Sequence, residues 1–366
     1  MSSGDTRVRY GVIGTGMMGV EHIENINALD GAVVTAISDT NEHSRRSGAE
    51  MASGDVAVFE THQELLASGL CDAVVIATPN FTHIDVLPDA LAADVHVMIE
   101  KPLCTTVADC ERVLDLAAQR PDHLITWMAM EYRYMPAAAE LISRVHGGAV
   151  GTPRMVAIRE HRFPFLHKVD NWNRFSENTG GTLVEKTCHF FDLMNLILQE
   201  RPTRVMASGA QDVNHLDESY DGRTPDILDN AFVIVDYPSG ARALLDLCMF
   251  AEATDEQEEM SVVGELGKVE ARLPSNTVLV GRRGEHGFGN VDKHVADDDR
   301  IAYEGHHHGS SFLEHSEFVD VIRNGGRPTV TLEDGYWAVA IGAAAHRSIE
   351  LGRPVELSEL MRDSER

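Results

Sequence analysis

The sequence predicts an α/β protein of two domains: an N-terminal domain with a doubly wound parallel sheet, and a C-terminal α+β domain with a large, mainly antiparallel open sheet. The length of 366 residues suits two domains, because a domain usually takes about 100–200 residues. Over residues 7–128, short β-branched runs alternate with helical patterns, which is typical of βαβ units. From residue 155 onward, strand patterns instead follow one another directly. We therefore expect domains at 1–128 and 129–366.

The first domain is expected to hold parallel strands joined by crossover helices. Runs rich in Val, Ile and Ala predict strands at Val8–Ile13, Val33–Ser38, Val56–Phe59, Ala73–Ala77, His96–Ile99 and Leu124–Met128. Apolar residues at helical spacing, opened by polar residues, predict helices at Met18–Asn27, Thr61–Leu66, Thr82–Ala92 and Thr106–Ala118. In such a sheet, ligands bind at the carboxyl ends of the strands.

A different pattern fills the second domain. After a helix at Pro136–Val145, strands are expected at Met155–Arg162, Arg204–Gly209, Ala231–Tyr237, Ala241–Phe250, Met260–Val263 and Lys268–Arg272. Residues 282–309 are rich in Gly, Asp and His and predict a mobile loop, and helices follow at Ser310–Ile322 and Leu332–Leu351. Antiparallel strands of this kind leave one face of the sheet for a second subunit, so we expect a homodimer or a homotetramer.

The charge balance excludes several classes of partner. Acidic residues number 58 and basic residues 31, which gives a net charge of −27. Such a surface repels phosphate backbones and anionic lipids, so we expect no nucleic-acid partner and no membrane partner. The five cysteines are odd in number and form no C-x-x-C pair, and residues 1–6 are polar and lack an apolar signal-peptide core. These features predict a cytoplasmic protein with reduced thiols.

A glycine-rich turn follows the first predicted strand and opens the first helix. Its sequence is Gly14-Thr15-Gly16-Met17-Met18-Gly19. Glycines there permit a tight turn and let backbone amides approach a pyrophosphate at the helix N-terminus. Asp39 lies 20 residues beyond Gly19, where a carboxylate accepts hydrogen bonds from an adenosine ribose and repels a 2′-phosphate. This context predicts a Rossmann domain that binds NAD rather than NADP. Arg45 and Arg46 could soften that preference or simply lie on a solvated helix face.

Polar residues also end the fourth and fifth predicted strands. The two segments are Ala77-Thr78-Pro79-Asn80-Phe81-Thr82-His83 and Glu100-Lys101-Pro102. Both come where an open parallel sheet places its ligand. A strand-terminal Glu-Lys is most often a surface ion pair, but here Lys101 could direct its ammonium group at a substrate oxygen.

These motifs together resemble the glucose-fructose oxidoreductase and inositol dehydrogenase family, often written Gfo/Idh/MocA. The resemblance covers nearly the whole chain, and the Glu-Lys-Pro tripeptide is its most specific mark. It implies that Lys101 contacts both the nicotinamide ribose and the substrate, and that Asn80 and His83 lie near the cofactor. It also implies a place for Arg133 in the substrate site. To the cofactor site we further assign Thr78, Pro79 and Glu100.

Paired glycines, Gly180 and Gly181, precede a strongly apolar run that reaches Asp192 and predicts a helix. Glu185 and His189 are four residues apart, so a continuous helix would place them on one face. The resemblance implies that His189 is the general acid or base, and family members usually carry Asp where this chain carries Glu185. The additional methylene moves the carboxylate by roughly a bond length. Asp192, one turn beyond His189, is an alternative partner.

Two further patches are candidates for the substrate pocket. The stretch Phe165–Arg174 mixes polar donors with aromatic side chains, although an ordinary surface loop explains it equally well. The candidates in this stretch are Lys168, Trp172 and Asn173. In the run His306-His307-His308, the side chains of His307 and His308 could line the substrate or face solvent. Adjacent histidines rarely share one tetrahedral ion, so we expect no metal.

These features predict an NAD-dependent oxidoreductase that transfers a hydride between the nicotinamide and a secondary alcohol carbon of a small-molecule polyol, sugar or cyclitol. His189 would exchange the hydroxyl proton, and Lys101 would stabilise the developing oxyanion. Two alternatives stay open. In one, a glycosidase or epimerase recycles NAD within a single turnover. In the other, a sugar-sensing regulatory protein binds its ligand without turnover, which the presence of both Lys101 and His189 disfavours.

Overall fold

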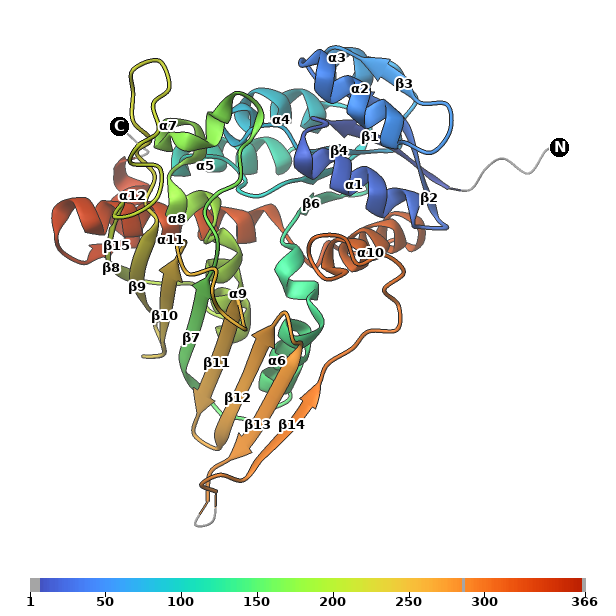
Figure 1. The fold of residues 1–366 in the computed structure, drawn as a ribbon. Helices are drawn as coiled ribbons and strands as arrows, with labels where there is room; N and C mark the ends of the chain where they lie inside the picture. Colours follow the sequence, from blue (N-terminus) through green and yellow to red (C-terminus); the bar gives the residue numbers. More distant parts are fainter. Residues whose placement is uncertain (1–6, 285–286, 364–366) are drawn as a thin grey trace. The chain divides into compact units, whose positions relative to one another are not determined.

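The computed structural model describes residues 7–284 and 287–363 (Figure 1). The polar opening segment, residues 1–6, lies outside the described residues. No helix in the described ranges is long and apolar enough to cross a membrane. The described chain divides into two compact units. The first unit comprises the described residues up to Glu131 with Lys168–Trp172 and Arg300–Tyr336, and the second comprises Tyr132–His167, Asn173–Asp299 and the described residues from Trp337 onward.

A six-stranded parallel sheet forms the centre of the first unit, in the order β3-β2-β1-β4-β5-β6. Its strands are β1 (Val8–Ile13), β2 (Ala32–Ser38), β3 (Ala57–Phe59), β4 (Ala73–Ile76), β5 (His96–Ile99) and β6 (Thr126–Met128). Its helices are α1 (Met17–Asn27), α2 (Glu42–Met51), α3 (His62–Ala67), η1 (Asn80–Thr82), α4 (His83–Ala92), α5 (Val107–Ala117) and α10 (Ser310–Asn324). Helix α1 packs on α2 and α10, while α4 packs on α3 and α5. The predicted doubly wound sheet is confirmed, and its strand order reverses between β1 and β4.

A nine-stranded sheet dominates the second unit, in the order β14-β13-β12-β11-β7-β10-β9-β8-β15. Neighbouring strands run antiparallel except for β7 and β10, which run parallel, so the predicted mainly antiparallel sheet is confirmed. Its strands are β7 (Pro153–His161), β8 (Arg204–Ala210), β9 (Asn230–Asp236), β10 (Arg242–Cys248), β11 (Glu258–Gly264), β12 (Gly267–Leu273), β13 (Thr277–Arg282), β14 (Val291–Val295) and β15 (Val355–Glu356). Its helices are α6 (Pro136–His146), α7 (Ser176–Thr179), α8 (Thr182–Glu185), α9 (Cys188–Leu198) and α12 (Leu357–Asp363). Three further helices, η2 (Glu131–Tyr134), η3 (Val169–Arg174) and α11 (Leu332–Leu351), have residues in both units.

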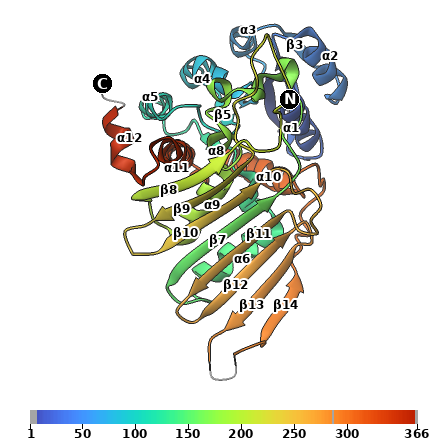
Figure 2. The ribbon, with the colours of Figure 1, turned by 60° about the vertical axis from the view of Figure 1, so that its left-hand side comes forward.

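One face of the nine-stranded sheet is covered by helices and the other is open. Helix α6 packs on β12 and β13, α9 packs on β7, and the two helices also contact each other (Figure 2). Side chains along the central strands alternate between the two faces, as expected for a half-covered sheet. The open face carries large, exposed apolar side chains on β7, β8, β9 and β10, namely Met155, Met206, Phe232, Ile234 and Leu244.

Several elements do not follow from the sequence pattern, among them β13, β15 and α12. The predicted loop over 282–309 is wrong in part, because it contains β14, which pairs with β13. Four of the five β14 residues are exposed, so the apolar alternation that identifies a strand is missing. The sequence pattern also misses α2, whose composition is polar. Asn41 begins this helix by accepting a hydrogen bond from the backbone N–H of Ser44 (3.1 Å).

Two carboxyl groups lie opposite each other on the covered face of the sheet. Glu160 on β7 is in register with Glu258 on β11, and both are buried. The Glu160 carboxylate pairs with Lys186 (Nζ to Oε1, 2.8 Å) and Arg162 (Nη1 to Oε1, 3.3 Å). Gln257 donates a hydrogen bond to Oε1 of Glu258 (2.6 Å). Burial and the neighbouring Glu160 carboxylate raise the pKa of Glu258 to about 7.

We predict that Glu258→Gln stabilises the protein more at high pH than at low pH. The carboxyl binds its proton more tightly in the folded state than in the unfolded state, so stability falls as the pH rises from about 4.5 to about 7. A neutral glutamine avoids this loss, which is on the order of 1–3 kcal/mol above neutral pH. Thermal unfolding at about pH 5 and about pH 8.5 measures the difference. Glu259→Gln, on the opposite face of β11, is the control. An equal gain at both pH values would contradict the prediction.

Candidate active site

The glycine-rich turn between β1 and α1 forms an open cradle. Gly14 has a left-handed backbone (φ 88°), and a Cβ there would lie 2.7 Å from the carbonyl group of Ala77. A Cβ at Gly19 would collide with the carbonyl oxygen of Gly14, whereas nothing lies within 4 Å of a Cβ placed at Gly16. The first residues of the helix are Met17 and Met18. The free space at the helix N-terminus fits a dinucleotide pyrophosphate, which backbone N–H groups would bind.

Asp39 follows β2, and its carboxylate lies against this turn. It accepts hydrogen bonds from the backbone N–H groups of Thr15 (2.8 Å) and Asn41 (2.8 Å). Arg45 donates to the backbone carbonyl oxygens of Asp39 (2.6 Å) and Thr40 (3.0 Å). The guanidinium group of Arg45 is therefore held by the backbone, and the carboxylate stays beside the cradle, where it can meet an adenosine ribose.

The segment after β4 adds a second wall to the cofactor site. Thr78 and Pro79 precede η1, and the amide nitrogen of the buried Asn80 side chain has no hydrogen-bond partner among the described residues. The ring nitrogens of His83 lie 2.9 Å from the carbonyl oxygen of Pro102 and 3.1 Å from that of Thr78. Burial lowers the pKa of His83, so a neutral ring joins this segment to the loop after β5.

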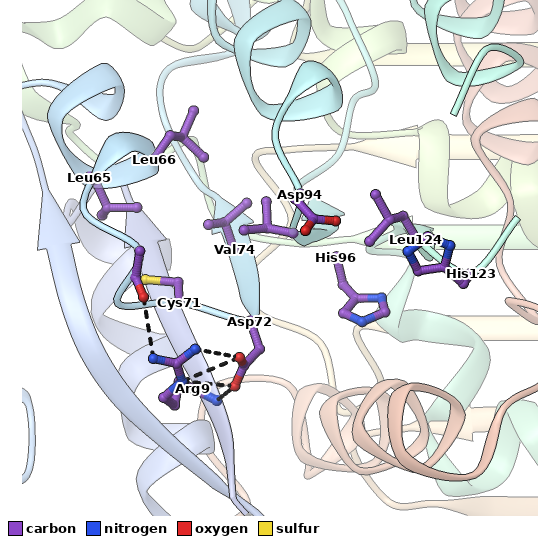
Figure 3. A pocket seen from close by; sticks show the side chains of 12 residues that line it. Arg9, Leu65, Leu66, Cys71, Asp72, Val74, Asp94, His96, His123 and Leu124 are labelled. Atoms are coloured by element: carbon purple, nitrogen blue, oxygen red, sulfur yellow. Dashed lines mark hydrogen bonds and ion pairs between the residues drawn. The ribbon is translucent and has the colours of Figure 1, made fainter. Parts of the chain in front are cut away.

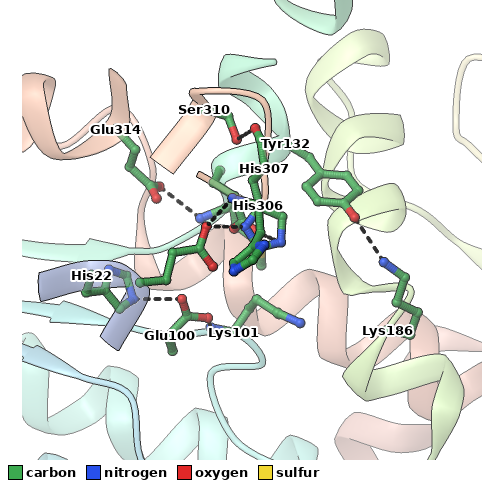
Figure 4. A network of polar contacts seen from close by, with 12 residues as sticks. His22, Glu100, Lys101, Tyr132, Lys186, His306, His307, Ser310 and Glu314 are labelled. Carbon is green, nitrogen blue, oxygen red and sulfur yellow. Dashed lines mark hydrogen bonds and ion pairs between the residues drawn. The ribbon is translucent and has the colours of Figure 1, made fainter. Parts of the chain in front are cut away.

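Lys101 follows β5, and buried polar contacts fix its backbone (Figure 4). The Glu100 carboxylate accepts a hydrogen bond from the Lys101 N–H (3.0 Å) and lies 2.8 Å from Nε2 of His22. Nδ1 of His22 lies 2.8 Å from Nε2 of His315. Burial would raise the pKa of Glu100, but the hydrogen bond with His22 and the charges of His22 and Lys101 lower it. The strand end that carries the candidate ammonium group is thus held firmly.

His307 lies near Lys101 in the same unit. Its Nδ1 is 2.8 Å from Oε1 of Glu21, and its Nε2 is 3.8 Å from Oε1 of Glu131. Burial lowers the pKa of His307, but the hydrogen bond with Glu21 and the charge of Glu131 outweigh that effect and raise it; the charge of Lys101 acts in the lowering direction. His308 is exposed at the surface. Of these two predicted substrate contacts, the structure brings His307 to the network around Lys101.

The predicted substrate loop is divided between the two units. Lys168 and Trp172 belong to the first unit, where Nζ of Lys168 lies 5.7 Å from the Trp172 ring centroid. The Trp172 ring meets Phe81 of η1 edge-on, with centroids 6.3 Å apart, so Trp172 lies beside the cofactor wall. Asn173 belongs to the second unit, where its buried side chain donates to the carbonyl oxygen of Leu166 (3.0 Å).

Glu185 and His189 both lie in the second unit, but no continuous helix carries them. Helix α8 ends at Glu185 and α9 begins at Cys188, because Thr187 (φ −91°, ψ 0°) leaves the helical path. The Thr187 hydroxyl donates to the carbonyl oxygen of Leu183 (2.8 Å). The expectation of one shared helical face is therefore wrong, although both side chains are buried.

Three residues that the sequence does not single out belong with His189. The Tyr132 ring stacks on the imidazole, with centroids 4.1 Å apart and an interplanar angle of 8°. Lys186 donates to the Tyr132 hydroxyl (2.9 Å) and pairs with Glu160 (2.8 Å). A signal for them exists in the chain: Lys186 interrupts an apolar run, and Glu160 takes an inward position on a strand. Buried charges of this kind require partners.

Arg133 and Asp192 form a largely buried ion pair in the second unit. Nε of Arg133 donates to Oδ2 of Asp192 (2.6 Å), and Nη2 donates to Oδ1. This bidentate contact joins η2 to α9. The resemblance assigns Arg133 to the substrate site, and the sequence offers Asp192 as an alternative partner of His189. In the structure these two residues are bound to each other.

Two other features bear on the site. In the part of the chain that the structure describes, no group of three or more His, Cys, Asp or Glu side chains is arranged to hold a metal ion. A cavity of about 540 Å³ lies at the amino ends of the parallel strands, where Arg9 pairs with Asp72 (2.6 Å) near His96 (Figure 3). Because ligands of such sheets bind at the carboxyl ends, this cavity is separate from the cofactor site.

Comparisons with known proteins agree with this geometry. Residues 8–126 match the family model described as the oxidoreductase family, NAD-binding Rossmann fold, and residues 142–357 match the C-terminal alpha/beta domain of the same family. The chain is 30% identical to a myo-inositol 2-dehydrogenase of Thermotoga maritima over 358 residues, which are 97% of this chain and 100% of the relative. It is 28% identical to inositol 2-dehydrogenase 1 of Saccharopolyspora erythraea over 352 residues, 96% of each chain. A crystal structure of a probable dehydrogenase from Thermotoga maritima superimposes with a TM-score of 0.78 at 27% identity, covering 96% of this chain and 100% of that one.

These matches decide several predictions. The NAD-binding model covers the glycine-rich turn and Lys101, so the predicted Rossmann domain and NAD cofactor are confirmed. The predicted enzyme class, an NAD-dependent dehydrogenase acting on CH–OH donors, is also confirmed. The two models together span most of the sequence, as the resemblance does. The chain therefore belongs to the Gfo/Idh/MocA family of oxidoreductases.

Proposed function

We propose that the protein transfers a hydride between NAD and a secondary alcohol carbon of a cyclitol, a sugar or a sugar derivative. Two relatives named as inositol 2-dehydrogenases support this substrate class. The observation that carries the proposal is that contacts within the fold hold both the backbone of Lys101 and the imidazole of His189. The backbone of Lys101 is held by Glu100, and the imidazole of His189 lies flat against Tyr132. Such preorganisation is what proton transfer and charge stabilisation require.

When bound, NAD supplies a nicotinamide ring that exchanges a hydride with the substrate carbon. The glycine-rich turn would bind the pyrophosphate through backbone N–H groups, and Asp39 would accept hydrogen bonds from the adenosine ribose. His189 would take the hydroxyl proton on a ring nitrogen during oxidation, and Lys101 would stabilise the negative charge that develops on the substrate oxygen. Glu185 would orient His189 or bind a substrate hydroxyl.

A screen of inositols, aldoses and simple glycosides for net NADH formation tests this function. Net NADH formation identifies a dehydrogenase. A product that forms without net NADH indicates that NAD is recycled within the turnover. Ligand binding without any product supports the regulatory alternative, and would contradict the proposal.

Of the predictions that the proposed function generates, the first concerns the cofactor. The wild-type protein should prefer NAD over NADP by at least about 10-fold in kcat/KM, because a 2′-phosphate beside the Asp39 carboxylate costs roughly 1.4 kcal/mol or more. Asp39→Asn keeps an acceptor for the Thr15 N–H but removes the charge, so the ratio should narrow. Steady-state kinetics with both cofactors measure this, with the exposed Asp55→Asn as a control. Equal kcat/KM values in the wild type would show that Asp39 does not select NAD.

The second prediction concerns catalysis on a substrate found by the screen. Lys101→Ala and His189→Ala should each lower kcat by about 10²–10⁴-fold and leave the NAD affinity within a few-fold, since neither side chain is assigned to the pyrophosphate. Glu185→Asp restores the residue usual in the family. Near-full activity would mean that this carboxylate only orients His189, and a large loss would mean that it contacts substrate. Wild-type turnover in both alanine variants would refute the catalytic assignment.

We also propose that a second copy of this chain covers the open face of the nine-stranded sheet, in a homodimer or a homotetramer. In register, Ile234 on β9 faces Leu244 on β10 and Met206 on β8, so the apolar side chains form a continuous patch. Arg159 pairs with Asp246 (3.0 Å) and with Glu259 (3.2 Å) on the same face. A patch with both apolar area and both signs of charge can pair with itself around a two-fold axis.

The third prediction follows from this patch. Phe232→Glu and Ile234→Glu each introduce a charge that two copies would bury, so both variants should form a smaller species than the wild type. Size-exclusion chromatography with light scattering measures the mass. Val58→Glu, at an exposed apolar residue of the first unit, is the control and should leave the mass unchanged. A wild-type monomer at micromolar concentration would rule out the assembly.

A further inference from the structure

The imidazole of His189 has an aromatic partner in the second unit. The Tyr132 ring lies nearly parallel to it, with centroids 4.1 Å apart and an interplanar angle of 8°. Phe190 meets the same tyrosine ring edge-on, with centroids 5.7 Å apart and an angle of 71°. All three residues are buried. The plane of the Tyr132 ring therefore limits the planes that the His189 ring can adopt.

A buried lysine holds the far end of that tyrosine. Nζ of Lys186 donates to the Tyr132 hydroxyl oxygen (2.9 Å) and pairs with Oε1 of Glu160 (2.8 Å), and Figure 4 shows the first of these contacts. The same nitrogen lies 5.1 Å from the Tyr132 ring centroid. Arg162 supplies a second cation to Glu160 (3.3 Å). The Lys186 ammonium is thus anchored on one side by a carboxylate and directed on the other at the phenol.

Packing alone does not account for this arrangement. Burying a lysine and a glutamate costs several kcal/mol per ion before their attraction offsets it, and apolar residues of similar volume often stabilise a core at least as well. The ion pair instead fixes the position of the Tyr132 ring, because the ammonium group of Lys186 donates to the Tyr132 hydroxyl oxygen. That oxygen belongs to the ring on which His189 rests.

We propose that Lys186 is a positioning residue for His189: through Tyr132 it holds the imidazole in the plane from which the proton is transferred, and Glu160 anchors the ammonium group. This inference rests on the proposed function, which makes His189 the general acid or base. The contacts follow one another from Glu160 to Lys186, then to Tyr132, then to His189. Lys186 acts only through Tyr132 and does not need to touch the substrate.

The kinetic test separates orientation from binding. Tyr132→Phe removes only the hydroxyl that Lys186 holds, and Lys186→Met removes the ammonium group. Each should lower kcat by about 10–100-fold with KM changed less than about 3-fold, because a misplaced catalytic group costs rate of this order without loss of substrate affinity. Lys186→Arg should recover part of the rate. The double variant of Lys186→Met with Tyr132→Phe should cost no more than the larger single loss, because both act on one contact.

A spectroscopic test needs no substrate. In protein carrying ¹³C-labelled histidine, the Hε1 resonance of His189, assigned by its loss in His189→Gln, should be displaced by the stacked phenol ring. Lys186→Met should move this resonance toward the position of an unstacked imidazole. Lys268→Met is the matched control, since Lys268 is a half-exposed lysine paired with Glu270 (2.9 Å) in the same unit. It should leave both the resonance and kcat unchanged.

Folding controls keep the test decisive. Lys186→Met leaves a buried carboxylate with one cation fewer, so Lys186→Met combined with Glu160→Gln removes both charges if the single variant does not fold. Loss of thermal stability with an unchanged His189 resonance and an unchanged kcat would overturn the inference.

His189→Ala separates the two proposals: retained turnover there refutes the proposed function. If His189→Ala abolishes turnover while Tyr132→Phe and Lys186→Met behave as wild type, only the positioning role fails.

Discussion

The burial of Glu160 on the covered face of the large sheet constrains the interior of the second unit. Burying an ionised carboxylate costs free energy unless cations pair with it. Lys186 and Arg162 form such ion pairs with Glu160. Lys186 lies in the turn between α8 and α9, and from there its ammonium group pairs with the Glu160 carboxylate. The same negative charge contributes to the raised pKa of Glu258 on the adjacent strand. One buried charge thus links the sheet, the broken helix and the aromatic stack on His189.

In the first unit, too, buried carboxyl groups need partners, and two of them have partners of different kinds. Glu314 accepts hydrogen bonds from Nε1 of Trp127 (3.2 Å) and from the backbone N–H of Met130 (2.9 Å), and burial raises its pKa well above the ordinary value. Glu100 instead has His22 beside it and the Lys101 charge nearby, and its pKa is lowered. The hydrogen bonds from these neutral donors favour the ionised Glu314, but burial favours its protonated form more strongly. At Glu100, cationic partners stabilise the ionised form enough to outweigh burial. The ionised Glu100 is the group that fixes the backbone of Lys101.

Sequence reasoning recovers most of the first unit because its signals are local. The bounds of β1 and β5 agree with the expected strands at both ends, and the glycine-rich turn stands where its motif requires. Elements whose own residues show no apolar periodicity are not predicted. Helix α2 is polar and depends on the cap at Asn41, and β14 is an exposed strand that only its pairing with β13 defines. A strand exposed along most of its length has no alternation of apolar and polar residues, so its sequence carries no periodicity to detect.

The same distinction divides the candidate site. Asp39 and Lys101 are recognisable because each follows a predicted strand, but Tyr132, Glu160 and Lys186 come together only through the fold. The rule that joins residues four apart assumes an unbroken helix, and Thr187 breaks it between Glu185 and His189. Glu185 therefore does not share one continuous helix face with His189. The break determines where that carboxylate lies, and the orientation of His189 depends, in our proposal, on the aromatic stack and the buried lysine behind it.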